Sequence, residues 1–284
     1  MSNPISSPTV PSLSVSVVVY HTDPAVVRAT FDSLLESVDF ARASHDLGPV
    51  SVHLVHNGDA SPSFSALALQ IGERCRQHQV AFRLFDGHGN VGYGRGHNLS
   101  IRGVRSDYHL VLNPDVVLRR ESLAQGVQHL QSNPGVVALS PSVSDGEGHK
   151  QHACKRFPTV MDFVLRGFAP HSVKKLFDKR LARYEMRDLP EHEASTGVPI
   201  ISGCFMLFRT SALQAVEGFD ESYFLYFEDF DLSLRVQKQG ALVYLPSMQI
   251  THLGGHSAKK GLRHIAMFAR SGCRFYNSHG WRLL

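Results

Sequence analysis

The sequence predicts an α/β protein with a mostly parallel central sheet, flanked by helices and followed by a helical C-terminal extension. Two observations lead to this fold class. Short β-branched apolar runs alternate with segments of helical periodicity through the first half of the chain, and basic segments of helical character follow in the second half. Strands that alternate with helices of this length form βαβ units, whose strands are parallel.

The elements follow one another at regular spacing. The first strand covers residues 14–20 (SVSVVVY), and Thr22-Asp23-Pro24 is typical of a helix start with proline at the first helical position. In the first half we expect further strands at 50–56, 81–85, 108–112 and 136–140, and helices at 24–37, 64–78, 94–104 and 122–131. In the second half we expect strands at 200–209, 241–245 and 248–251, and helices at 211–216, 229–239 and 261–277.

Composition limits the class of protein. The chain has 284 residues, of which 43% are hydrophobic and 19% charged, as is ordinary for a globular protein. The formal charge of +4 fits an anionic small ligand or a membrane surface, or may reflect solubility alone, and we expect no nucleic-acid partner. Four cysteines without a C-x-x-C pair favour a reducing compartment and argue against structural zinc.

Targeting signals are absent from the sequence as given. The Ser/Pro-rich start has neither the basic nor the apolar region of a signal peptide, and no stretch approaches the roughly 18 apolar residues of a membrane span. We therefore expect a cytoplasmic protein, at most peripheral on the inner face of the plasma membrane. The sequence leaves the oligomeric state open.

Polar residues directly follow several of the predicted strands. They are His21, Asn57, Asp86 and the segment Asn113-Pro114-Asp115. Ligands of open parallel sheets bind beyond the carboxyl ends of the strands. We therefore expect these residues to gather on one edge of the sheet and to form the first candidate for a site.

A glycine pattern in the same half resembles a dinucleotide fingerprint. Gly87-x-Gly89-x-x-Gly92 follows a strand and precedes a helix. It lies on the third βα unit rather than the first, and the next strand ends in Asn-Pro-Asp rather than in a lone ribose-binding acid. The pattern therefore does not favour a dehydrogenase.

Two acidic clusters and one histidine could carry chemistry. Asp115, placed by Pro114 at the sheet edge, could hold a divalent cation, although an Asx or proline turn is the plainer interpretation. Glu228-Asp229 lies below an aromatic run that could raise a carboxyl pKa towards that of a general base, although acids at a helix start are often only caps. His252, before a glycine pair, could complete a metal shell or contact phosphate, or simply be a hydrogen-bonded surface residue.

The basic segment 163–184 (FVLRGFAPHSVKKLFDKRLARY) has imperfect periodicity. It is either a solvated helical insertion that packs its apolar face, or a surface that faces anionic lipid or a lipid-linked acceptor.

The order of these motifs carries a resemblance that runs from residue 14 to about 276. The matching segments are VSVVVYH (15–21), LVHNGD (54–59), GNVGYGRGHNLSI (89–101), LVLNPDVVL (110–118), ISGCFMLFR (201–209), GFDESYFLYFEDFDLSLRVQKQG (218–240) and ITHLGGHS (250–257). The chain resembles inverting family-2 glycosyltransferases with the GT-A fold, in particular bacterial rhamnosyltransferases of cell-surface polysaccharide synthesis.

The resemblance implies a donor site, a metal and a base. Donor-binding residues would be Val19, Tyr20, His21, Asn57, Asp59, Asn90, Gly92, Gly96, Asn98, Asn113 and Asp115. Asp115 would bind Mg²⁺ or Mn²⁺ with His252 as a weaker further contact, and Asp229 would be the catalytic base. The partners would be a nucleotide-sugar donor, favoured as dTDP-L-rhamnose over UDP- or GDP-linked sugars, and a saccharide or lipid-linked glycan acceptor in O-antigen, lipopolysaccharide core or capsule synthesis.

The resemblance also implies a division of the chain. A flexible leader at 1–13 would precede one GT-A domain at 14–284. That domain would consist of a nucleotide-binding half at 14–118 and an acceptor-binding half at 119–284, with a variable insertion at 158–190.

Two positions depart from the family pattern. His56 stands where the family often has an acid that contacts the base, which puts base recognition in doubt, and Asn113 replaces the first acid of a strict DxD motif. A nucleotidyltransferase would need a glycine-rich basic loop after the first strand, where this chain has Tyr20-His21-Thr22-Asp23-Pro24. A catalytically silent binding module would be expected to have lost one of the two carboxylates, and both are present.

Overall fold

The computed structural model describes residues 10–254 and 261–284. Most of the expected leader therefore lies outside the described residues. The described end of that leader is attached to the domain, because the Ser12 N–H and hydroxyl both donate to the Asp107 carboxylate at 2.8 and 2.7 Å. No helix among the described residues is long and apolar enough to cross a membrane.

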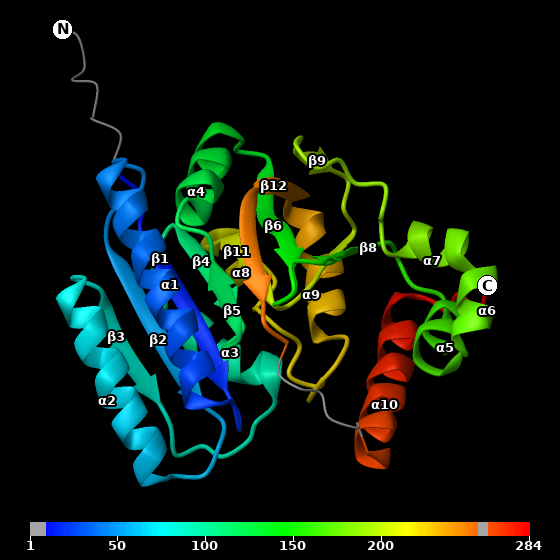
Figure 1. Ribbon diagram of the computed structural model, residues 1–284, viewed down its shortest axis with the longest axis horizontal. Coiled ribbons are helices and arrows are strands. Elements are labelled where there is room, and N and C mark those ends of the chain that lie inside the picture. Colours follow the sequence, from blue (N-terminus) through cyan, green and yellow to red (C-terminus); the bar gives the residue numbers. More distant parts are fainter. Residues whose placement is uncertain (1–9, 255–260) are drawn as a thin grey trace, which may run out of the picture.

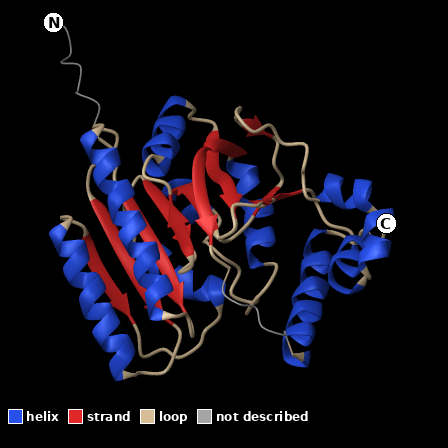
Figure 2. Cartoon of the chain, viewed as in Figure 1, coloured by secondary structure: helices blue, strands red, loops and turns tan. Residues whose placement is uncertain are grey.

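A mixed sheet forms the centre of the molecule (Figures 1 and 2). Its strands are β1 (Leu13–Val19), β2 (Val50–His56), β3 (Ala81–Phe85), β4 (Tyr108–Leu112), β5 (Val116–Leu118), β6 (Val136–Ser144), β7 (Lys150–Gln151), β9 (Ser195–Thr196), β11 (Phe205–Arg209) and β12 (Ala241–His252). The main order is β3-β2-β1-β4-β11-β6-β12-β5. The strands β1 to β4 are parallel, as expected, and β6 is parallel to β12. Between these two parallel groups lies β11, which is antiparallel to both of its neighbours.

Helices cover both faces of the sheet and form a separate C-terminal group. They are α1 (Pro24–Ala43), α2 (Pro62–Gln77), α3 (Tyr93–Ile101), α4 (Ser122–Ser132), α5 (Val160–Phe168), α6 (His171–Leu176), α7 (Asp178–Tyr184), α8 (Thr210–Ala215), α9 (Glu228–Val236) and α10 (Leu262–His279). Helices α1, α2 and α4 pack on one face and α3, α8 and α9 on the other. Helices α5, α6, α7 and α10 gather beside the sheet (Figure 1), and we call this group, with the tail 280–284, the C-terminal lobe.

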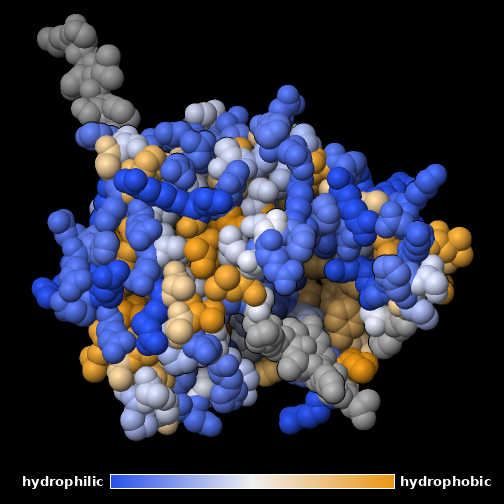
Figure 3. Space-filling model, in the orientation of Figure 1, coloured by the Kyte–Doolittle hydropathy of each residue, from blue (hydrophilic) through white to orange (hydrophobic). Residues whose placement is uncertain are grey.

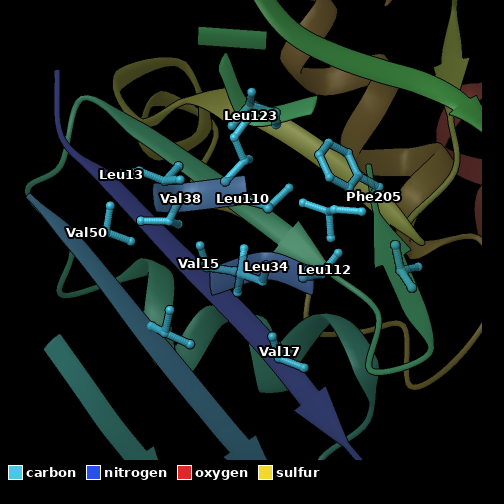
Figure 4. Close-up of a cluster of buried hydrophobic side chains, with 14 of the residues drawn as sticks. Leu13, Val15, Val17, Leu34, Val38, Val50, Leu110, Leu112, Leu123 and Phe205 are labelled. Carbon is cyan, nitrogen blue, oxygen red and sulfur yellow. The ribbon is translucent and has the colours of Figure 1, made fainter. Parts of the chain in front are cut away.

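Three apolar clusters hold these layers together. The largest joins α1, α2 and α4 to one face of the sheet, and part of it is drawn in Figure 4, where Val15 and Val17 of β1 meet Leu34 of α1 and Leu112 of β4. A second cluster joins α3, α8 and α9 to the opposite face. The third is aromatic and joins the C-terminal lobe to the segment around Phe227. Because the strands at the centre are covered on both sides, β1 and β4 are buried along their whole length.

The first half of the chain confirms the expected elements closely, and the second half corrects two of the expectations. The strand expected at 200–209 is broken into β10 (Ile200–Ile201), which pairs with β8 (Cys154–Lys155), and β11, with a turn at Gly203 between them. The strands expected at 241–245 and 248–251 form one strand, β12, with a register shift between Leu245 and Gln249. The basic segment 163–184 is helical, as expected, and consists of parts of three short helices, because Pro170 lies between α5 and α6 and Phe177 ends α6.

Candidate active site

A cavity of about 870 Å³ opens at the carboxyl ends of β1, β2 and β4. Six of the residues expected to bind the donor line it: Tyr20, Asn57, Asn90, Gly92, Asn113 and Asp115. They come from three strand ends and from the loop before α3, so the parallel sheet brings them together as its topology predicts.

Three further expected residues lie in an adjoining cavity. Val19, His21 and Asp59 line a space of about 580 Å³ together with His56. The His56 ring stacks on Phe64 with 3.4 Å between ring centroids, and burial lowers the pKa of His56 below its usual value. A neutral imidazole in a flat stack therefore occupies the position where the family often has an acid.

The glycine-rich loop is held against the site by the Asn57 amide. The Asn57 Nδ2 donates to the Gly92 carbonyl at 2.8 Å, and its Oδ1 accepts from His88 Nε2 at 3.1 Å. Gly92 itself has φ of 90°, and a Cβ there would lie 2.3 Å from the Phe224 carbonyl oxygen. Only glycine fits this position, both for its backbone conformation and for its close approach to the neighbouring chain.

Two expected donor residues have packing roles in this structure. A Cβ on Gly96 would lie 3.0 Å from Val18 Cγ2, so this glycine lets α3 approach β1. The Asn98 amide is used at both ends, because Nδ2 donates to the Phe219 carbonyl at 2.8 Å and Oδ1 accepts the Phe219 N–H at 2.9 Å. Asn98 lines a different cavity from Asp115, so the structure does not bring it to the donor pocket.

The Asn-Pro-Asp turn is anchored from three directions. The Thr30 hydroxyl donates to the Pro114 carbonyl at 2.8 Å, and the Asn113 N–H donates to the Cys204 carbonyl at 2.9 Å. On the third side the Leu253 N–H donates to the Asp115 carbonyl, and His252 Nε2 lies 3.3 Å from Asp115 Oδ1. The turn therefore holds the Asp115 carboxylate in the cavity wall, next to the imidazole that was expected to share a cation with it.

This pair of groups suits one type of cation site. Among the described residues, no three His, Cys, Asp or Glu side chains come together as a metal cage. Mg²⁺ is typically held by one or two protein ligands together with substrate phosphates and water. Asp115 in the wall of the cavity, with the His252 imidazole 3.3 Å from its carboxylate, therefore fits a cation that is shared with a bound diphosphate.

The second acidic cluster begins α9 after two unusual backbone residues. Tyr226 and Phe227 both lie in the left-handed region, with φ of 70° and 68°. Such conformations are unfavourable for non-glycine residues and persist where the surrounding packing enforces them. Here the packing is aromatic, because the Phe227 ring lies 5.0 Å from both Phe163 and Phe268. The strained turn directs Asp229 towards the turn at Gly203.

The two carboxyl groups of the cluster differ in their hydrogen bonds. Asp229 accepts the Gly203 N–H at 2.9 Å and the Phe230 N–H at 3.0 Å, whereas Oε2 of buried Glu228 has no hydrogen-bond partner among the described residues. Burial raises the pKa of Glu228, and the neighbouring Asp229 charge raises it further. Burial also raises the pKa of Asp229, but the two N–H donors oppose this. The two N–H donors therefore favour the ionised form at Asp229 over the ionised form at Glu228.

A short chain of contacts links Asp229 to the cavity. Tyr93, which lines the cavity, donates from its hydroxyl to the Gly203 carbonyl at 2.6 Å, and the Gly203 N–H donates to Asp229. The carbonyl of Cys204, the next residue, accepts the N–H of Asn113 in the Asn113-Pro114-Asp115 turn. The start of β11 thus connects the two acidic clusters, which lie more than a hundred residues apart in the sequence. Asp229 itself lies beside the cavity rather than among the residues that line it.

Helix α10 contributes residues that the sequence pattern did not single out. Arg263 and His264 line the large cavity, and His264 Nδ1 lies 2.9 Å from the Tyr226 hydroxyl. The signal in the sequence was only the basic character of the final helix. The expected motif around His252 continues into His256 and Ser257, which lie outside the described residues.

Comparisons with known proteins agree with this geometry. The family model described as "Glycosyltransferase like family 2" matches residues 10–266. The rhamnosyltransferase WbbL of Escherichia coli K12 is 26% identical over 189 residues, which cover 63% of this chain and 67% of WbbL. An N-acetylglucosaminyl-diphospho-decaprenol L-rhamnosyltransferase of Mycobacterium tuberculosis is 30% identical over 239 residues, which cover 78% of this chain and 73% of that protein.

Solved structures show the same fold at low sequence identity. GalNAc-T7 with UDP, GalNAc and Mn²⁺ aligns with a TM-score of 0.62 at 12% identity over 96% of this chain, and this chain spans about half, 51%, of that one. The mannosyltransferase PcManGT of Pyrobaculum calidifontis, in complex with GDP-Man and Mn²⁺, aligns with a TM-score of 0.60 at 15% identity, over 95% of this chain and 69% of that one.

The family model covers most of the chain, and the solved neighbours share its fold. The chain belongs to the family-2-like glycosyltransferases and is a glycosyltransferase of the GT-A fold.

Proposed function

We propose that this enzyme transfers L-rhamnose, with inversion, from dTDP-L-rhamnose to a hydroxyl of a lipid-linked or other saccharide acceptor in cell-surface polysaccharide synthesis. The sugar and the type of acceptor follow from the two rhamnosyltransferases that the chain resembles, one of which acts by its name on an N-acetylglucosaminyl-diphospho-decaprenol. The observation that carries the chemistry is the link through Gly203 and Tyr93 between Asp229 and the cavity that contains Asp115.

The residues that line the cavity divide by the part of the donor that they would contact. In this proposal Tyr20, Asn57 and Gly92 contact the base and ribose. Asp115 and Arg263 line the same cavity, and the positive charge of Arg263 would balance the diphosphate. Bound Mg²⁺ or Mn²⁺, held by Asp115 and His252, would offset the charge that develops on the departing diphosphate.

Asp229 would act on the acceptor. As the acceptor oxygen forms its bond to the anomeric carbon, its proton moves to the Asp229 carboxylate, and the bond from that carbon to the diphosphate oxygen breaks with its electrons leaving on the nucleoside diphosphate. One displacement from the face opposite the leaving group inverts the anomeric configuration. The hydrogen bonds from Gly203 and Phe230 favour the ionised form of Asp229, which a base requires.

A panel of nucleotide sugars tests the donor. The melting temperature should rise most with dTDP-L-rhamnose in the presence of Mg²⁺, because ligand stabilisation follows affinity. dTDP-glucose, UDP-N-acetylglucosamine and GDP-mannose serve as controls for base and sugar. A larger shift with a UDP- or GDP-linked sugar would overturn the proposed donor while leaving the glycosyltransferase assignment unchanged.

A further inference from the structure

A further, smaller cavity lies in the C-terminal lobe, away from the candidate active site. It has a volume of about 290 Å³ and is lined by four arginines, Arg156, Arg180, Arg183 and Arg282, together with one acidic side chain, Asp162, and the last residue, Leu284. The tail of the chain forms one wall of this cavity. The Arg282 and Leu283 carbonyls accept the N–H groups of Val160 and Met161, the first two residues of α5, at 2.9 and 3.3 Å, and these bonds hold the tail in place.

The four arginines divide into two that are paired and two that are not. Arg180 is bonded to Asp162 at 2.7 Å, and Arg156 is bonded to Asp188 at 3.1 Å. Within the described residues, no carboxylate lies within ion-pair distance of Arg183 or Arg282, and both are exposed. The Arg282 guanidinium lies over the Phe157 ring, 4.2 Å from its centroid, which orients it without neutralising it. The cavity therefore keeps an excess of positive charge that faces solvent.

Exposed leucines lie in the same lobe as this charge, and one of them, Leu284, lines the cavity. Leu284, Leu176 and Leu283 are 85%, 80% and 64% exposed, and of the described residues elsewhere only Leu69 is a comparably exposed leucine. Figure 3 shows apolar atoms at the right-hand edge of the molecule, over α6 and the C-terminal end. Single exposed leucines are ordinary, but a group of them beside unpaired arginines is typical of a surface that binds a membrane or another protein.

The combination of unpaired arginines and exposed leucines distinguishes a soluble phosphate from a phospholipid membrane as the partner. Arginine binds phosphate oxygens in a bidentate manner, which accounts for the charge alone. A soluble phosphate would leave the leucines exposed to water. A lipid bilayer of anionic phospholipids satisfies both, because its phosphates lie at the level of the guanidinium groups and its acyl chains begin just below them.

We propose that the C-terminal lobe docks on anionic membranes, with a phospholipid phosphate bound in the cavity between Arg183 and Arg282 and with Leu176, Leu283 and Leu284 inserted at the headgroup boundary. This site differs from a general attraction to the basic segment 163–184. Arg180 takes no part in it, because that side chain is used by Asp162 and Thr159 inside the lobe. Reversing the charge of Arg180 would break its partly buried ion pair with Asp162 and would test folding rather than docking.

The test is sedimentation of the full chain with vesicles. The wild-type protein should bind vesicles of phosphatidylcholine with 30% phosphatidylglycerol, should bind pure phosphatidylcholine vesicles at least tenfold more weakly, and should be released as NaCl rises well above physiological strength. The double variant Arg183→Gln/Arg282→Gln should raise the lipid concentration for half-binding about 30-fold, which corresponds to about 1 kcal/mol for each arginine near the surface. The variant Leu176→Asn, at a side chain that is 80% exposed, should also weaken binding.

A matched control uses two arginines that are exposed on the opposite half of the chain. Arg28→Gln/Arg105→Gln removes the same charge and should change vesicle binding less than threefold. Equal losses in the two double variants would show a non-specific charge effect and would overturn the site. A different result would overturn the lipid and indicate a soluble phosphate ligand. In that case the wild-type protein would not bind anionic vesicles but would be stabilised by millimolar inorganic phosphate, and Arg183→Gln/Arg282→Gln would abolish this stabilisation. The melting temperature of each variant in buffer shows whether it has folded.

Discussion

At the scale of single residues, the site depends on which carboxyl group carries charge. Asp229 and Glu228 are neighbours in the sequence, Glu228 buried and Asp229 half-buried, yet only Asp229 receives two backbone N–H groups. The substitution Asp229→Asn keeps the shape of the side chain and removes the proton acceptor. We expect turnover to fall roughly 100- to 10,000-fold, the range that a general base contributes.

Donor binding separates this effect from misfolding. The dissociation constant of the nucleotide-sugar donor, measured by calorimetry with Mg²⁺, should stay within about twofold of the wild-type value in Asp229→Asn. Wild-type turnover in this variant would show that another group accepts the proton.

Asp115 should control the metal dependence of donor binding. Its carboxylate is held by the Pro114 turn next to His252, and we expect a cation there to bridge to the diphosphate. In the wild type, Mg²⁺ should strengthen donor binding at least tenfold, and Asp115→Ala should remove this dependence. Asp59→Ala, in the adjoining cavity, is the control, because donor binding should still respond to Mg²⁺. If titrations of Asp115→Ala with and without Mg²⁺ differ as they do in the wild type, Asp115 is not a metal ligand.

Tyr93 should act on the base through Gly203. Its hydroxyl donates to the Gly203 carbonyl, and the same residue's N–H donates to Asp229. Tyr93→Phe keeps the ring that lines the cavity, so the KM for donor should change little. We expect kcat to fall about three- to tenfold, consistent with the loss of one hydrogen bond of about 1 kcal/mol, and the acidic limb of the kcat against pH profile to move. A change in KM alone would indicate that Tyr93 contacts the donor instead.

At the scale of elements, the start of α9 should make stability depend on pH. Burial and the Asp229 charge raise the pKa of Glu228 above its usual 4.5. When the pKa of a carboxyl group is higher in the folded than in the unfolded state, ionisation stabilises the unfolded chain first. The contribution of Glu228 to the free energy of unfolding is therefore fully present below pH 4.5 and is lost as the pH rises through the folded pKa.

The variant Glu228→Gln removes this titration while keeping the size of the side chain. Its melting temperature should match that of the wild type near pH 4.5 and should exceed it increasingly towards pH 8. A difference that shrinks as the pH rises would contradict protonated Glu228 in the native protein.

The strands and helices also show where the local sequence is sufficient to predict the bounds of an element. The strands β2, β3 and β4 begin and end at the residues that their apolar runs predict, and Asp23-Pro24 starts α1 as expected. These signals are local, because β-branched runs and helix caps act over a few residues. The break at Gly203 has no such signal. It depends on Asp229 and Tyr93, which bond to the Gly203 N–H and carbonyl from two other parts of the chain.

At the scale of the whole molecule, the C-terminal lobe packs against the turn that precedes α9. Phe275 is fully buried and lies 5.4 Å from Phe227, centroid to centroid, and the Ser271 hydroxyl donates to the Leu225 carbonyl at 2.8 Å. Phe275→Ala should lower the free energy of unfolding by about 3–5 kcal/mol, as truncation of a buried phenylalanine does. Urea denaturation measures this loss.

A surface substitution provides the reference for this prediction. Leu69→Ala, at a side chain that is 76% exposed, should change the free energy of unfolding by no more than about 0.5 kcal/mol. Equal effects of the two variants would show that the aromatic cluster does not stabilise the fold.

The sequence by itself determined the α/β class, the βα units of the first half and the edge of the sheet at which the large cavity opens, because these follow from periodicity and from the geometry of parallel strands. It also identified Asp115, His252 and Asp229 as candidates through motif order. Only the tertiary structure decided how the expected donor residues divide between two cavities, that Asn98 is used in packing, and that Arg263 and His264 reach the site from α10. The physical reason is that these contacts join residues far apart in the chain, and no local pattern encodes which buried surfaces will meet.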